Sequence, residues 1–100
     1  GPYATNWHGT QGTATFRMMV DNNSADDLKV LAINVHDAIT STNLAEMHIT
    51  RKQFAAPFSY QDFSLSFDLA DRIGHPIEVR AFWTGISYLK VDKVTVSLTP

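Results

Sequence analysis

Apolar and polar residues alternate along most of this chain. The alternation is strictest in the stretch YQDFSLSFDL, residues 60–69, where every second residue from Phe63 to Leu69 is apolar. Such a two-residue repeat is typical of a β-strand that turns one face to the core and the other to water. We therefore expect a strand here whose inward side chains are Phe63, Leu65, Phe67 and Leu69.

The same repeat predicts three earlier strands, at residues 13–20, 28–36 and 45–50. The third could pass for a short helix, but its β-branched and threonine neighbours favour a strand. The turn between the first two, DNNSADD at 21–27, is rich in Asn and Asp, which hydrogen-bond their own backbone. The longer connection at 51–59 is expected to cross between two sheets.

The last alternating stretch, PIEVRAFWTGISYLKVDKVTVSL, predicts a hairpin. Its two strands would pair Trp83 with Leu89, with Gly85 in the turn. After Val91 the apolar parity switches, so we expect a β-bulge near Asp92. This hairpin would gather five side chains on its outer face: Glu78, Arg80, Phe82, Tyr88 and Lys90.

These elements predict one all-β domain over residues 1–100, an antiparallel β-sandwich. Residues 3–12 are polar and are expected to form an irregular entry or a frayed edge strand. An immunoglobulin-type sandwich is the competing architecture, but the chain has no cysteine pair. Without cysteine it has neither disulfides nor thiolate zinc sites.

Composition excludes two classes of partner. The formal charge is -2 and no basic run is present, so the footprint of a nucleic-acid-binding protein is missing. No apolar run approaches the roughly 20 residues that cross a bilayer, so we expect no membrane partner. The catalytic motifs GxSxG, HExxH and GxGxxG are absent, and we expect a protein that is not an enzyme.

Three stretches carry a family resemblance: GTATFRMMVDNN, YQDFSLSFDL and IEVRAFWTGISYLKVDKVTVSL. They resemble the non-catalytic carbohydrate-binding modules with a β-jelly-roll fold, similar to families six and thirty-five and their relatives. The resemblance covers most of the chain. It implies a jelly-roll fold, a polysaccharide ligand, an extracellular or cell-surface location and a catalytic domain elsewhere in a longer parent chain. The glutamate-rich first strand of such modules is not found here, which implies that an N-terminal strand is missing.

Sugar recognition needs an aromatic face for the ring's C–H groups and planar polar groups for its hydroxyls. On the predicted hairpin face, Tyr88 and Phe82 would form the platform, and Arg80, Glu78 and Lys90 would bind hydroxyls. Cross-strand pairs of the same residue types also stabilise an ordinary exposed sheet, which is the competing interpretation.

Three further residues are candidates for ligand contact. Trp83 shares its parity with inward residues, so it is either a core anchor or a rim residue that stacks on sugar. Trp7 lies in a polar stretch with no apolar periodicity to bury it. His36 points outward on the second strand, where it is either a solvated residue or a ligand contact.

Two aspartates are candidates for a structural calcium ion. Asp92 corresponds to the last-strand ligand that the resemblance implies. Asp21 opens DNNSADD, which supplies oxygen ligands but lacks the glycine and terminal glutamate of an EF-hand loop. A solvated turn is the competing interpretation of that stretch.

The leading functional hypothesis is therefore a carbohydrate-binding module that holds a catalytic partner near its substrate. The rival hypothesis is a structural or protein-interaction sandwich without a sugar ligand. Under that hypothesis Met18, Met19 and Phe82 would mark a protein interface.

Overall fold

The computed structural model describes residues 3–4, 11–69 and 75–99. It is all-β with two antiparallel sheets, one in the order β1-β6-β3-β4 and the other in the order β5-β2-β7. One short 3-10 helix, η1, follows β4. The elements are β1 (Tyr3–Ala4), β2 (Gln11–Val20), β3 (Lys29–Asp37), β4 (Thr42–Thr50), η1 (Arg51–Gln53), β5 (Gln61–Asp68), β6 (Ile77–Trp83) and β7 (Leu89–Thr99).

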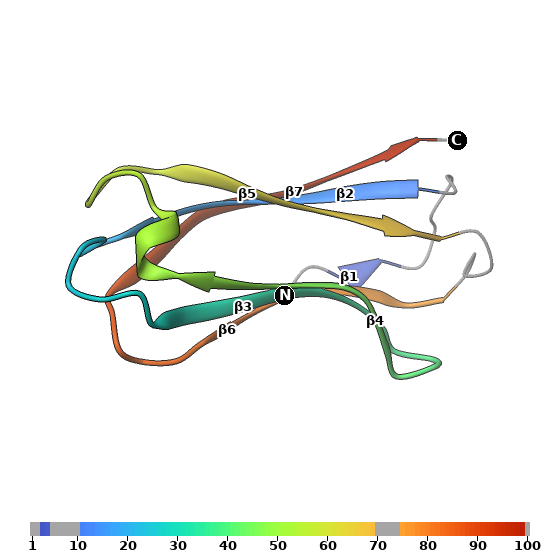
Figure 1. The fold of residues 1–100 in the computed structure, drawn as a ribbon. Coiled ribbons are helices and arrows are strands. Elements are labelled where there is room, and N and C mark those ends of the chain that lie inside the picture. Colours follow the sequence, from blue (N-terminus) through green and yellow to red (C-terminus); the bar gives the residue numbers. More distant parts are fainter. Residues whose placement is uncertain (1–2, 5–10, 70–74, 100) are drawn as a thin grey trace.

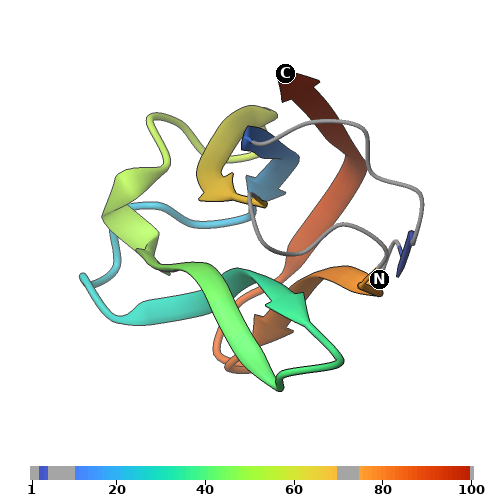
Figure 2. The same ribbon diagram turned by 90° about the vertical axis from the view of Figure 1, so that its right-hand side faces the viewer.

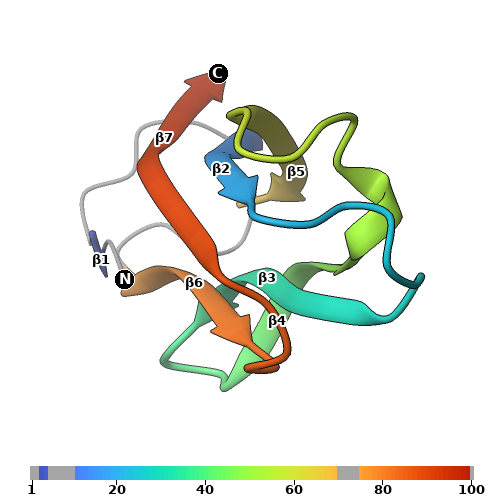
Figure 3. The same ribbon diagram turned by 90° about the vertical axis from the view of Figure 1, so that its left-hand side faces the viewer.

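The two sheets lie one above the other (Figure 1), an arrangement compatible with a β-sandwich. Seen along the strands, β7 and β6 lie on one side of the molecule and β5 and β4 on the other (Figure 3). The opposite end view shows the same two layers (Figure 2). Residues 51–60 connect β4 to β5 on that side and pass from one sheet to the other. The sequence had predicted such a crossing for residues 51–59.

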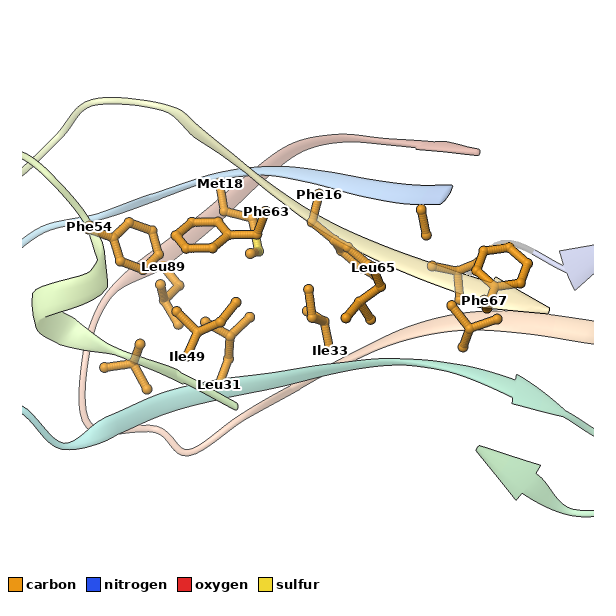
Figure 4. Packing of buried hydrophobic residues seen from close by; sticks show 14 of the residues in the cluster. Phe16, Met18, Leu31, Ile33, Ile49, Phe54, Phe63, Leu65, Phe67 and Leu89 are labelled. Carbon is orange, nitrogen blue, oxygen red and sulfur yellow. The ribbon is translucent and has the colours of Figure 1, made fainter. Parts of the chain in front are cut away.

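A single core fills the space between the sheets (Figure 4). The strictest alternation gave the correct inward face, since Phe63, Leu65, Phe67 and Leu69 are all buried. Burial of apolar surface from both sheets is the main contribution that holds the layers together. The largest fully buried side chains include Phe16, Met18, Leu31, Ile33, Ile49 and Phe54.

The predicted bulge is confirmed. Along β2 and β7, Arg17 pairs with Lys93 and Met18 pairs with Val91, so Asp92 is the extra residue. The extra residue lets Val91 and Val94 both turn toward the core although they are three positions apart.

The predicted hairpin is wrong. Trp83 at the end of β6 pairs with Leu31 of β3, whereas Leu89 at the start of β7 pairs with Val20 of β2. The segment around Gly85, which has a φ of 86°, therefore connects two sheets rather than two neighbouring strands. Alternation had placed Glu78, Arg80 and Phe82 on the outer face of β6 correctly but could not identify that strand's neighbour.

Met18 and Met19 are both buried, with 0% and 8% of their surface exposed. They therefore belong to the packed interior and do not mark a protein interface. Within the described part of the chain, no helix is long and apolar enough to span a membrane.

Candidate functional site

The outer side of the four-stranded sheet brings together four of the seven described residues that were expected to contact sugar: Glu78, Arg80, Phe82 and His36. Because β6 alternates, Glu78, Arg80 and Phe82 all point away from the core, and β3 lies beside them. In register, Glu78 faces His36 and Arg80 faces Asn34. Two distant stretches of sequence thus supply neighbouring side chains.

Strand β4 extends this surface on the far side of β3. Asn34 faces Glu46, and His36 faces Asn43 just after a register shift. We name the surface formed by Asn34, His36, Asn43, Arg80 and Phe82 the Arg80 face. It is built on regular strands, which hold side chains more precisely than loops do.

Hydrogen bonds hold the guanidinium of Arg80 in one orientation on this face. Arg80 Nε donates to Asn34 Oδ1 at 2.9 Å, and Arg80 Nη2 donates to Asn43 Oδ1 at 3.2 Å. Asn34 is only 3% exposed beneath the guanidinium. A ligand that meets this surface would not have to order the guanidinium itself, which lowers the entropic cost of binding.

The same network places a hydrogen on one ring nitrogen of His36. Its Nδ1 lies 2.8 Å from Asn43 Oδ1, an oxygen that also accepts from Arg80. A carbonyl oxygen can only accept, so the His36 Nδ1 must carry a hydrogen. The described residues provide no partner for its Nε2.

An aromatic ring adjoins this polar network. Phe82 is 52% exposed, and the guanidinium carbon of Arg80 lies 5.2 Å from the ring centroid. Across the sheet the ring faces the small, buried Ala32. The cation holds the ring by a cation–π contact and leaves part of its surface open to solvent.

The charge of Arg80 is not neutralised by any carboxylate among the described residues; its partners are the neutral amides of Asn34 and Asn43. Elsewhere on the sheet, Glu46 lies 3.7 Å from His48, and Lys29 Nζ lies 3.1 Å from His48 Nδ1. The Arg80 face therefore keeps a cation, the exposed amide of Asn43 and an open ring available for a ligand.

Tyr88 and Lys90 do not lie on this face. Tyr88 precedes β7, in the other sheet, and its carbonyl accepts a hydrogen bond from the Asp21 N–H at 3.1 Å. Its side chain is 59% exposed at the end of the molecule where the loops after β2, β4 and β6 meet. The grouping of Tyr88 with Arg80 depended on the wrong hairpin.

Trp83 is neither fully buried nor part of the Arg80 face. It is 50% exposed at the end of β6 and lines a groove of about 530 Å³ between the edges of β6 and β7. The residues that line the groove all have apolar side chains: Phe16, Val79, Ala81, Phe82, Trp83, Val91 and Val94. Trp7 lies outside the described residues.

A second hollow, of about 320 Å³, borders the other end of the sheets. Its wall combines short polar side chains such as Thr13, Ser66 and Ser97 with Phe67, whose ring is only 5% exposed. It offers no open aromatic surface for a sugar ring, so we do not place the ligand there.

The two candidate calcium ligands already have partners. Arg17 Nε lies 3.6 Å from Asp92 Oδ2, so a cation already stands beside that carboxylate. Asp21 Oδ1 accepts a hydrogen bond from Ser87 Oγ at 2.8 Å. Among the described residues, no three or more His, Cys, Asp or Glu side chains gather into a group that could hold a metal ion, and the calcium ion stays a prediction.

Sequence reasoning missed Arg51, which organises the loop end. It is 7% exposed, and its guanidinium donates to Asp26 Oδ1, to Ser87 Oγ and to the carbonyls of Asn22 and Ile86. One side chain thus ties the loop after β2 to the loop before β7. A lone arginine in a polar stretch gives no signal of such burial.

Phe58 was also missed. It is 69% exposed, its φ is 54°, and its N–H donates to the Val20 carbonyl at 2.8 Å. A left-handed φ is uncommon for a bulky residue and has a conformational cost. No sequence pattern marked this conformation, because the residue is not a glycine or an asparagine.

Comparison with known proteins adds no assignment. No protein-family model matches the chain, and no curated protein matches it.

Proposed function

We propose that this protein is a non-catalytic carbohydrate-binding module that binds a polysaccharide on the Arg80 face. One observation carries the proposal: Arg80 is held rigidly by two neutral amides beside the exposed ring of Phe82. Planar donors bind pairs of sugar hydroxyls, while an aromatic face covers the ring's C–H groups.

The polar atoms around Phe82 suit hydroxyl recognition. The His36 Nε2 and the Asn43 amide nitrogen have no partner among the described residues, and Glu78 lies next to His36 across the strands. Hydrogen-bond donors and acceptors thus lie near one another on the Arg80 face. A flat, solvent-open surface of this kind suits a polymer chain rather than a small molecule enclosed in a pocket.

We also propose that the fold is of jelly-roll type. Successive strands leave one sheet for the other at every described connection except that between β3 and β4. Frequent crossing between sheets supports the double Greek key of a jelly roll over a simple meander. The resemblance of the three sequence stretches to jelly-roll carbohydrate-binding modules points the same way.

Binding at a single open surface would be modest, and neighbouring modules would raise it through avidity. The proposal places the domain outside the cell or on its surface, attached to a catalytic domain that acts on the same polysaccharide. Calcium has no role in the Arg80 face, so sugar binding should be the same with calcium and with a chelator.

The test is affinity electrophoresis against soluble β-glucans, xylans, mannans, chitosan, alginate and pectins. Retardation by at least one polymer is expected for the wild type, with loss of retardation in Arg80→Ala and Phe82→Ala. Tyr88→Ala is the matched control, because it removes an exposed ring from the loop end. Loss of binding in Tyr88→Ala with normal binding in Arg80→Ala would move the site away from the Arg80 face.

A further inference from the structure

The strand β7 forms one edge of the three-stranded sheet. Among the described residues it pairs with β2 on one side and with nothing on the other. An edge strand exposes a row of backbone N–H and C=O groups that can pair with another strand. The outer edge of β7 is therefore a surface that another chain can join.

The two halves of β7 differ in how readily their outer edge can pair with another strand. Residues 89–93 include Lys90 and Lys93 and contain the bulge at Asp92, all of which hinder pairing with another strand. Residues 94–99, VTVSLT, carry no charge, no proline and no bulge, and most are β-branched. The second half has the composition of a strand that pairs readily.

Apolar surface beside this edge is incompletely covered. Val94, Val96 and Leu98 point toward the core but are only partly buried. Val94 also lines the apolar groove that reaches Trp83 on β6. The described residues of β1 do not cover the part of β6 near Trp83, because they pair only with Ile77 and Glu78.

We propose that two copies of this chain associate through antiparallel pairing of residues 94–98 of β7. A twofold axis at Val96 would set Val94 opposite Leu98 of the second copy and Thr95 opposite Ser97 of the second copy. Opposed residues of an antiparallel pair point to the same face, so the apolar side chains of both copies meet on the core side. The result is one continuous six-stranded sheet, in the order β5-β2-β7-β7-β2-β5.

Charge supports a second copy as the partner. In this register Lys93 stands opposite the uncharged Thr99 of the second copy, and no like charges face each other. Thr95 and Ser97 are exposed on the outer face of the sheet, where hydroxyl pairs across strands are favourable. The pairing is isologous, so it closes at two copies and does not continue into a fibre.

The test is sedimentation velocity over a range of protein concentrations, together with amide hydrogen exchange. The wild type is expected to be a dimer that dissociates on dilution. Thr95→Lys with Ser97→Lys would oppose like charges twice and is expected to weaken association about tenfold or more. Thr95→Lys with Ser97→Glu is the matched control, which opposes unlike charges and should keep the dimer.

Three results would overturn the proposal. The first is a wild type that stays monomeric at high concentration with fast exchange along β7. The second is a monomer whose outer β7 amides are protected, which would mean that another segment covers the edge. The third is a dimer that the double lysine variant leaves unchanged. Circular dichroism of both variants checks that the fold is retained.

Discussion

The two sheets share one core but differ in what they present to solvent. On the three-stranded sheet the polar groups satisfy each other: Thr15 Oγ1 lies 2.9 Å from Ser64 Oγ, and Arg17 lies 3.4 Å from Asp62 and 3.6 Å from Asp92. On the four-stranded sheet, Arg80 is held by the amides of Asn34 and Asn43.

The two sheets differ in the groups that surround Arg17 and Arg80. Carboxylates neutralise Arg17, whereas Arg80 keeps its charge beside an exposed ring. Arg17 also lies near a ring, 5.7 Å from the centroid of Tyr60, so proximity to an aromatic residue does not separate the two faces. A surface that only needs to be soluble can use ion pairs and hydroxyls, whereas Arg80, without a carboxylate partner among the described residues, is the cation that the proposed function assigns to a ligand.

The largest effect is expected from a substitution in the core that the two sheets share. Phe67 of β5 is 5% exposed and packs so tightly on Gly12 of β2 that a Cβ at Gly12 would lie 2.5 Å from its ring. Phe67→Ala should lower the free energy of unfolding by about 3–5 kcal/mol. Urea denaturation measures this loss, and a loss below about 1 kcal/mol would contradict the shared core.

The next effect should appear in binding. Arg80→Ala should weaken polysaccharide binding about tenfold or more, because it removes the fork of donors and the support of Phe82. Arg80→Lys should recover little, since an ammonium group lacks the planar fork. Isothermal titration calorimetry would measure both, and full recovery in the lysine variant would mean that only the charge matters.

The matching change on the other sheet should have a small effect. Arg17 is 40% exposed and its two ion pairs are screened by water. Arg17→Ala should therefore cost no more than about 1 kcal/mol of stability and leave polysaccharide affinity unchanged. If affinity fell as it does in Arg80→Ala, the two faces would not differ in the way proposed.

The smallest expected effect is a pH dependence at the loop end. The Leu28 N–H, with Arg51 and Lys52, holds the pKa of Asp26 below its ordinary value of 3.8. Because the folded-state pKa is the lower one, Asp26 stabilises the fold above a pH of about 4, and this contribution is lost as pH falls through the folded-state pKa. Asp26→Asn should flatten this part of the stability profile in urea unfolding at pH 6 and pH 3, and an unchanged profile would contradict the assignment.

Much of the fold could be predicted because alternation is a local property. The inward face of β5 and the bulge at Asp92 follow directly from parity, and both are confirmed. The neighbour of a strand depends instead on contacts between residues far apart in sequence, as when Trp83 pairs with Leu31. The turn-like sequence around Gly85 suits a hairpin and a crossing between sheets equally well.

The candidate site was predicted only in part, for the same reason. Arg80, Phe82, Glu78 and His36 were correctly expected to point outward, and the structure brings them together. Tyr88 was grouped with them through the wrong strand pairing. Asn43 was not recognised, because an asparagine beside a turn is ordinary, and only the register of β3 and β4 places it next to His36 and Arg80.

The most direct test of the central claim is an NMR titration of the isotope-labelled protein with an oligosaccharide of whichever polymer retards it. We expect the amide and side-chain signals of the Arg80 face to shift together with one affinity: Asn34, His36, Asn43, Arg80 and Phe82. The signals of Thr15, Arg17 and Ser64 on the opposite sheet should stay in place. Shifts centred on the opposite sheet or on the loop end around Tyr88, with the Arg80 face unchanged, would contradict it.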